Sequence, residues 1–282
     1  MEAFDSNILS KLIFFLENSG TDPAIDSPAA NEIKLFTRPE SIKTAFGQGA
    51  QALIAATDFF EALDSLVHQD KYAIAPWLCA RGMIEASSLF AWLFETGIDS
   101  IERVSRSLSL RYSALREQQK LARYDGNNAN SDEIENRIKA IEDMARTLGY
   151  GVLRDQNNRR IGIGQIKPNI TKLVEMQFSS EKLYRMLSGM AHSNYTTLTS
   201  LAFTKPNFKN KGGAVIQRAV PSAQLRTLLS HAGKIYAKCL WLKTMQFGFD
   251  AAKLAVLLEE FYDTLKIDDS NENRFWRTLV KT

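Results

Sequence analysis

The sequence predicts an all-α protein, a helical bundle of about nine helices with long helices and no sheet. Apolar residues recur at helical spacing along most of the 282-residue chain. The seven prolines and fifteen glycines are few and gather between these periodic runs, which favours long helices over many short strands. The hydrophobic content of 45% beside 24% charged residues is typical of a globular protein with a substantial core.

Apolar spacing predicts five helices in the first half of the chain. Their residues are 4–18, 40–69, 76–94, about 100–124 and 131–148. Gly47 and Gly49 weaken the second helix and predict a kink or a close approach of another helix. The third helix is apolar nearly all round, so we expect it at the centre of the bundle, and Pro76 suits its first turn. Asp99 or Ser100 can cap the fourth helix.

The second half of the chain begins with a basic, irregular stretch at 149–167, which we interpret as a surface loop. Helices are expected from Pro168, from Ser179 or Ser180 onward, and from Pro221 to Leu265 with a break near 247–250. A basic loop at 206–213 and a short terminal helix around Phe275, Trp276 and Leu279 complete the prediction. In chain order this gives an N-terminal region (1–70), a central core (71–204) and C-terminal helices (205–282) in one compact domain.

The overall composition limits the classes of function. The net charge is only +3, so any surface for nucleic acid must be local. Cys79 and Cys239 lie in separate apolar runs without a zinc-binding spacing, which favours free, buried thiols in a reducing compartment. The N-terminus lacks a basic leader, and its apolar run at 12–16 is too short for a membrane span. We therefore expect a cytoplasmic protein that does not associate with membranes.

Arg185 and His192 form the most site-like feature. Seven residues are close to two helical turns, so both side chains are expected on one helix face, about 10 Å apart along the axis. Ser188 lies between them, and Thr196 and Thr199 are expected to extend the polar row. The apolar stripe of the same helix is separate and comprises Tyr184, Leu187, Ala191 and Leu198.

Such a pair suits RNA cleavage. An imidazole titrating near neutrality can take the proton from a ribose 2′-hydroxyl or protonate the leaving oxygen. An arginine can hold the scissile phosphate and offset its developing charge. The chain has three histidines (His68, His192 and His231) and no cluster of acidic residues, so a route without a metal or cofactor is the more coherent one. The structural alternative is a solvated arginine beside a hydrogen-bonded histidine, and composition alone favours it.

The segment 185–192, Arg-Met-Leu-Ser-Gly-Met-Ala-His, resembles the R-x(4–6)-H motif of the HEPN superfamily. The resemblance implies a helical bundle with a HEPN-like core at 71–204 and metal-independent ribonuclease activity in toxin–antitoxin, CRISPR or phage-defence systems. It implies that Arg185 and His192 are the catalytic pair. It also implies a homodimer whose cleft combines two copies of the motif, and an antitoxin or another defence protein as partner.

The chain also resembles uncharacterised bacterial helical proteins over roughly residues 76–200. They share an Arg-x-x-x-Glu helix, here Arg81 and Glu85, and a Tyr-Arg-x-Leu-Ser-x-x-x-His segment, here 184–192. Charged residues in so apolar a helix are expected to pair, so a structural ion pair is the favoured interpretation. In the functional alternative the pair lines the cleft, where Glu85 orients His192 or Arg81 binds phosphate.

A basic stripe is the candidate surface for RNA. Arg106, Arg116, Lys120 and Arg123 fall within about 100° of one another, opposite the apolar stripe of their helix. Together with Arg154, Arg159 and Arg160 they can guide an RNA backbone, although a solvated helix face is the alternative. Aromatic residues do not alternate with these charges, so stacking of single-stranded bases has no support.

Three classes of function remain open at this point. The first is a HEPN-type ribonuclease acting as a toxin or defence effector. The second is a non-catalytic helical adaptor that binds a partner protein or a nucleotide. The third is a small-molecule-binding bundle in which Arg81, Glu85 and His192 lie inside a pocket.

Overall fold

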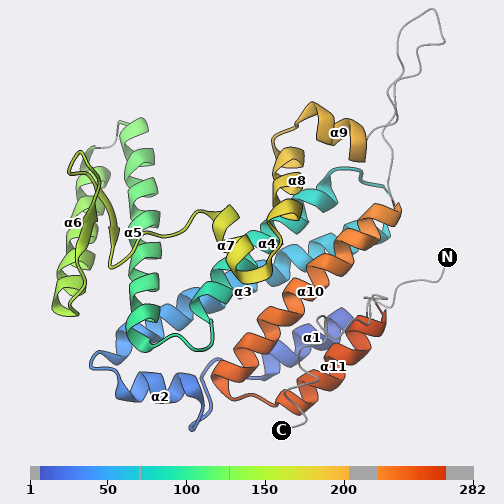
Figure 1. Ribbon diagram of the computed structural model, residues 1–282, viewed down its shortest axis with the longest axis horizontal. Helices are drawn as coiled ribbons and strands as arrows, with labels where there is room; N and C mark the ends of the chain where they lie inside the picture. The colour runs from blue at the N-terminus through green and yellow to red at the C-terminus, as the bar shows by residue number, and fades with distance from the viewer. Residues whose placement is uncertain (1–6, 70, 127, 203–221, 265–282) are drawn as a thin grey trace, which may run out of the picture. The chain divides into compact units, whose positions relative to one another are not determined.

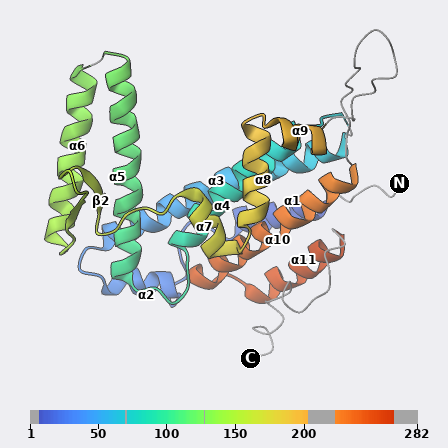
Figure 2. The ribbon, with the colours of Figure 1, turned by 45° about the horizontal axis from the view of Figure 1, so that its top comes forward.

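A computed structural model describes residues 7–69, 71–126, 128–202 and 222–264, and this part of the chain is all-α as predicted (Figures 1 and 2). Eleven helices are present among the described residues. In chain order they are α1 (Asn7–Asn18), α2 (Pro28–Leu35), α3 (Pro39–His68), α4 (Ala75–Leu93), α5 (Ser100–Tyr124), α6 (Asn128–Thr147), α7 (Ile170–Phe178), α8 (Glu181–Ala191), α9 (Tyr195–Leu201), α10 (Ser222–Phe247) and α11 (Ala251–Thr264).

Two details of the predicted fold are wrong. The expected surface loop at 149–167 contains a small antiparallel hairpin of β1 (Val152–Arg154) and β2 (Arg160–Ile163). Its turn is closed by Asp155, whose carboxylate accepts hydrogen bonds from two backbone N–H groups, those of Asn157 and Arg159. The count of about nine helices is too low, because α2 was not predicted and one expected helix is divided into α8 and α9.

The break between α10 and α11 is confirmed. It falls at Gly248, whose φ of +70° lies in the left-handed region that favours glycine. The expected loop at 206–213 and the expected terminal helix around 275–279 lie outside the described residues.

The chain divides into two compact units that alternate along the sequence. The first unit comprises Met1–Asn31, Gly49–Phe94 and Ile170–Thr282, and the second comprises Glu32–Gln48 and Glu95–Asn169. The division expected from the sequence consists of three consecutive regions, 1–70, 71–204 and 205–282. That division stays a prediction.

The core of the first unit is built around α4, as its apolar sequence predicts. This helix packs against α7, α8 and α10 (Figures 1 and 2). The side chains of Trp77, Phe90 and Trp92 are almost fully buried. The Phe90 and Phe94 rings stack with centroids 4.3 Å apart, and Phe94 also contacts Phe247 of α10. Among the described residues, no helix is long and apolar enough to cross a membrane.

Gly49 marks a close helix contact, as one of the two sequence alternatives predicts. A Cβ atom added at Gly49 would lie 2.4 Å from the Phe94 ring, whereas one added at Gly47 would meet no atom within 4 Å. We expect Gly49→Ala to lower the free energy of unfolding by about 1–3 kcal/mol through overpacking. The matched variant Gly47→Ala is expected to raise it by up to about 1 kcal/mol, because alanine is the better helix former. Urea unfolding followed by circular dichroism measures both, and a stabilising Gly49→Ala would contradict the close contact.

Both cysteines are free, and Cys239 is fully buried while Cys79 is half-buried. Burial raises the pKa of the Cys239 thiol from 9.0 to about 12. We therefore expect a thiol reagent to leave Cys239 unmodified in the folded protein and to modify it in denaturant. Its contribution to stability is complete below pH 9 and is lost as the pH rises towards 12. Mass spectrometry of a Cys79→Ser variant isolates the reaction of Cys239, and rapid modification of the native variant would contradict its burial.

The second unit pairs α5 with α6 and places β2 against α5 (Figure 2). Its most buried charge is Arg103, whose side chain has no exposed surface. Two hydrogen bonds of 2.8 and 2.9 Å join its guanidinium to both carboxylate oxygens of Glu32 in α2. The guanidinium carbon lies 4.9 Å from the centre of the Phe46 ring in α3. This arginine of α5 therefore contacts side chains of α2 and α3 inside the unit.

Candidate functional site

Arg185 lies on α8 and His192 is the C-cap residue of that helix, so the pair does not lie on the long helix that was expected. Arg185 is near the middle of α8, and His192 directly follows the last helical residue, Ala191. The chain then turns at Ser193, whose φ is +52°, and α9 begins at Tyr195. The prediction that Thr196 and Thr199 extend the polar row of the same helix is wrong, because both belong to α9.

Local capping explains this break. The Asn194 side chain accepts a hydrogen bond from the backbone N–H of Thr197, which caps the start of α9. The backbone N–H of Asn194 donates to the carbonyl of Gly189 at 2.8 Å. A Cβ atom at Gly189 would lie 2.6 Å from the Thr197 hydroxyl oxygen, so a glycine is needed where α9 folds back on α8. Asn194 was the sequence signal for this turn, and the helical periodicity on either side concealed it.

Both members of the pair face solvent. The Arg185 side chain is 69% exposed, and its guanidinium Nε donates to Glu181 one turn earlier at 2.7 Å. His192 is exposed, and its ring has no hydrogen-bond or ion-pair partner in the described part of the chain. Ser188 between them is half-buried. Glu181 was not singled out from the sequence, although its spacing of four from Arg185 is the usual one for a helical ion pair.

Tyr184 joins this helix to the Arg81/Glu85 pair of α4. Arg81 Nε donates to Glu85 Oε1 at 2.8 Å, which confirms the predicted ion pair. The Tyr184 hydroxyl donates to the same carboxylate oxygen at 2.7 Å, and the Arg81 guanidinium lies 5.8 Å from the Tyr184 ring centre. Burial raises the pKa of Tyr184, and the hydrogen bond to Glu85 raises it further.

The Arg81/Glu85 pair therefore connects α4 to α8 through Tyr184. Burial disfavours the charged form of Arg81, but the hydrogen bonds to Glu85 and Tyr184 outweigh burial and raise its pKa. The Glu85 carboxylate accepts its described hydrogen bonds from Arg81 and Tyr184 and not from His192. Its observed role is to hold Tyr184, the residue next to Arg185.

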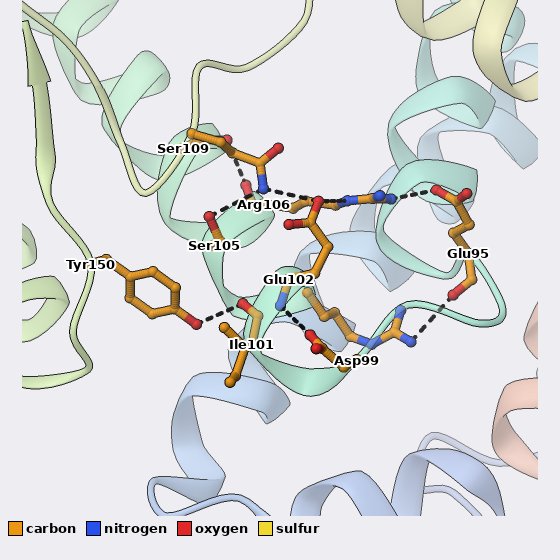
Figure 3. A network of polar contacts seen from close by, with 10 residues as sticks. Glu95, Asp99, Ile101, Glu102, Ser105, Arg106, Ser109 and Tyr150 are labelled. Atoms are coloured by element: carbon orange, nitrogen blue, oxygen red, sulfur yellow. Dashed lines mark hydrogen bonds and ion pairs between the residues drawn. The ribbon is translucent and has the colours of Figure 1, made fainter.

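Arg106 is not part of an exposed basic stripe, and that prediction is wrong. Its side chain is only 8% exposed and lies between the carboxylates of Glu102 and Glu95 (Figure 3). Gln165 donates to the same Glu102 oxygen at 3.1 Å. The helical wheel of α5 places Arg106 opposite the apolar stripe, but Glu95 and Gln165 lie outside α5 and enclose it. This arginine is held in a structural network and is not free to contact phosphate.

The other predicted RNA contacts are more exposed, but most are engaged with neighbours. Arg160 pairs with Glu135 and Glu142 of α6. On α5, Arg116 donates a hydrogen bond to Gln119, Lys120 forms an ion pair with Glu117, and Arg123 donates a hydrogen bond to Ser131 of α6. Arg159 lies exposed in the turn before β2, and Arg154 donates to the carbonyl of Asn158. Acidic residues therefore pair with Arg106 and Lys120 of α5, whereas the described partners of Arg116 and Arg123 are neutral.

Neither a metal nor a cofactor is assigned to the pair. Within the described ranges, no three His, Cys, Asp or Glu side chains gather in a way that could hold a metal ion. The predicted site residues at α8 offer the Arg185 guanidinium, the Ser188 hydroxyl and, at the C-cap, the His192 imidazole.

Comparison with known proteins gives a family and no assigned activity. A family model described as a family of unknown function (DUF5677) matches residues 51–210. Neither the curated proteins nor the solved structures include a match to the chain. The matched segment is more than half of the chain and includes Arg81, Glu85, Arg185 and His192. The chain therefore belongs to the DUF5677 family.

Proposed function

We propose that the protein is a metal-independent endoribonuclease of the HEPN type, in which Arg185 and His192 act on the RNA backbone. The observation that carries the proposal is the exposure of both side chains, Arg185 on α8 and His192 at the C-cap of α8, with no described partner for the imidazole. A histidine with a structural role is usually hydrogen-bonded within its own fold, as His231 is to the carbonyl of Thr227. His192 thus has the accessibility that a general acid or base requires.

The proposed reaction needs only groups of the RNA and of this chain. An imidazole takes the proton of the ribose 2′-hydroxyl as its oxygen attacks the adjacent phosphorus. The bond from phosphorus to the 5′-oxygen breaks, and an imidazolium supplies the proton that this oxygen takes up. The products are a 2′,3′-cyclic phosphate and a 5′-hydroxyl end. Arg185 moves from Glu181 to the phosphate and offsets the charge that develops there.

The proposal includes a homodimer. An exposed pair on one copy excludes little water and offers one imidazole, whereas the reaction uses an acid and a base. A second copy of α8 supplies the second His192 and covers the scissile bond. The small-molecule class is less well supported, because it requires Arg81, Glu85 and His192 inside one pocket and His192 is exposed.

The decisive experiment incubates the purified protein with total RNA in EDTA and compares it with His192→Ala. We expect cleavage by the wild type, 2′,3′-cyclic phosphate ends, and a loss of cleavage in the variant. His231→Ala is the matched control, because His231 is also exposed and lies on α10. Cleavage that His192→Ala leaves unchanged would overturn the role of His192. An inactive wild type would favour the adaptor class.

The cellular role that accompanies this activity is a toxin or phage-defence effector with a protein partner. Its support is the resemblance of the 185–192 segment to the HEPN motif. Expression in bacteria is then toxic, and Arg185→Ala relieves the toxicity. Equal growth of cells that express either form would contradict this role while leaving the biochemical test intact.

A further inference from the structure

A groove of about 400 Å³ lies between α5 and α6 in the second unit. Each helix contributes residues at spacing i, i+3, i+4 and i+7, which form one face of a helix. The same pattern, Arg-x-x-Ala-(Leu/Ile)-x-x-(Gln/Met), occurs at 111–118 in α5 and at 137–144 in α6. The two helices therefore line the groove with equivalent sets of side chains, each with an arginine at its start.

Arg111 and Arg137 are two cations without an acidic partner among the described residues. No carboxylate in the described part of the chain forms an ion pair with either guanidinium, whereas Arg106, Arg146 and Arg160 on or beside the same helices all have one. Arg111 is half-buried while Arg137 is exposed. Burial lowers the pKa of Arg111, and the positive charge of Arg137 lowers it further. A bound anion would relieve both effects.

An acidic side chain, Glu40, lines a second cavity beside Arg111 but pairs with another cation. Arg111 also borders a smaller cavity of about 80 Å³, which Glu40 and Thr44 of α3 line on the other side. The Glu40 carboxylate pairs with Lys43 at 2.8 Å, and no described ion pair joins it to Arg111. The guanidinium groups of Arg111 and Arg137 are therefore available to an anionic ligand.

The rest of the groove is apolar and roomy. Leu115 and Ile141 form a buried floor, and Met144 adds a flexible apolar wall. Ala114 and Ala140 are small and leave space above the floor. The volume lies within the range of about 300–1,000 Å³ that is typical of small-molecule sites.

We propose that the groove between α5 and α6 binds a small organic phosphate, with Arg111 and Arg137 holding the phosphate and the apolar floor holding its body. A phosphate monoester carries a charge of about −1.5 to −2 near neutral pH, which matches two guanidinium groups better than a carboxylate does. Planar guanidinium groups also bind phosphate through two parallel hydrogen bonds. The Gln118 amide at the edge of the groove can bond a polar group of the ligand. The site does not depend on the proposed ribonuclease activity.

The test is isothermal titration calorimetry of the full chain with defined probes. Phenyl phosphate and adenosine monophosphate carry both required features, inorganic phosphate lacks the apolar body, and benzoate has one charge instead of two. We expect both organic phosphates to bind more tightly than inorganic phosphate or benzoate. Arg111→Gln and Arg137→Gln each weaken binding about tenfold or more, because each removes a charged hydrogen-bond donor pair. Arg146→Gln is the matched control on α6, since Arg146 pairs with Asp143 and does not line the groove.

Several results would overturn the site. One is no binding of either organic phosphate by the wild type. Another is unchanged binding in both groove variants when circular dichroism reports the native helix content. Benzoate that binds as well as phenyl phosphate would exclude selection for phosphate. A short RNA that binds more tightly than adenosine monophosphate, with loss in the same variants, would replace the small ligand with an RNA backbone.

Discussion

Replacement of either Arg185 or His192 by alanine is expected to lower the rate of RNA cleavage about 100-fold or more. His192 supplies proton transfer and Arg185 supplies charge stabilisation, and water replaces either poorly. Both side chains are exposed, one on α8 and one at its C-cap, so the free energy of unfolding should change by no more than about 0.5 kcal/mol. The loss should therefore appear in the rate of cleavage and not in the amount of folded protein.

The chain offers a close control for the arginine. Arg146 on α6 is 71% exposed and pairs with Asp143 one turn earlier, much as Arg185 pairs with Glu181. Arg146→Ala should leave cleavage unchanged. The double variant of Arg185 and His192 should be no slower than the slower single variant, because residues that act in one step are not additive. Equal rates for Arg185→Ala and Arg146→Ala would remove Arg185 from the reaction.

Apolar periodicity predicts a helix of this fold well where the helix's own sequence determines which of its faces are buried. The segment that becomes α4 is apolar on all sides, and no arrangement leaves it at the surface without exposing Trp77, Phe90 and Trp92. Apolar periodicity predicts element boundaries less well where a short polar side chain caps a helix or closes a turn. Asn194 separates α8 from α9 by capping the start of α9, and Asp155 closes the β1–β2 turn. Neither residue changes the apolar pattern around it.

The candidate site shows the same limit more sharply. The Arg81/Glu85 pair could be predicted because both partners lie one turn apart on one helix. The burial of Arg106 could not, because Glu95 comes from outside α5 and a helical wheel contains one helix. The sequence did not single out the two groove arginines as a site. Arg111 and Arg137 are candidate ligand contacts because no described carboxylate pairs with them. The sequence alone does not show which charged side chains pair in the folded protein.

Arg103→Ala is expected to lower the free energy of unfolding by about 3–5 kcal/mol, the largest effect on stability that we predict. The side chain has no exposed surface and binds both oxygens of Glu32. Its removal leaves a cavity beside Phe46 and a carboxylate that is only 17% exposed without its charge partner. The exposed pair of Arg146 and Asp143 provides the comparison, and Arg146→Ala should cost about 0–1 kcal/mol.

The cause of this loss can be separated into packing and charge. Arg103→Met retains much of the volume, so its cost reports mainly the unpaired carboxylate of Glu32. Adding Glu32→Leu removes that carboxylate and should recover a large part of the stability, since apolar pairs often replace buried ion pairs without loss. Urea unfolding measures the free energies, and hydrogen exchange should show faster opening of α2 and of the start of α5 in Arg103→Met. If Arg103→Met cost less than about 1 kcal/mol, the pair would not hold α2 against α5, and the contact with Phe46 would carry the stabilisation instead.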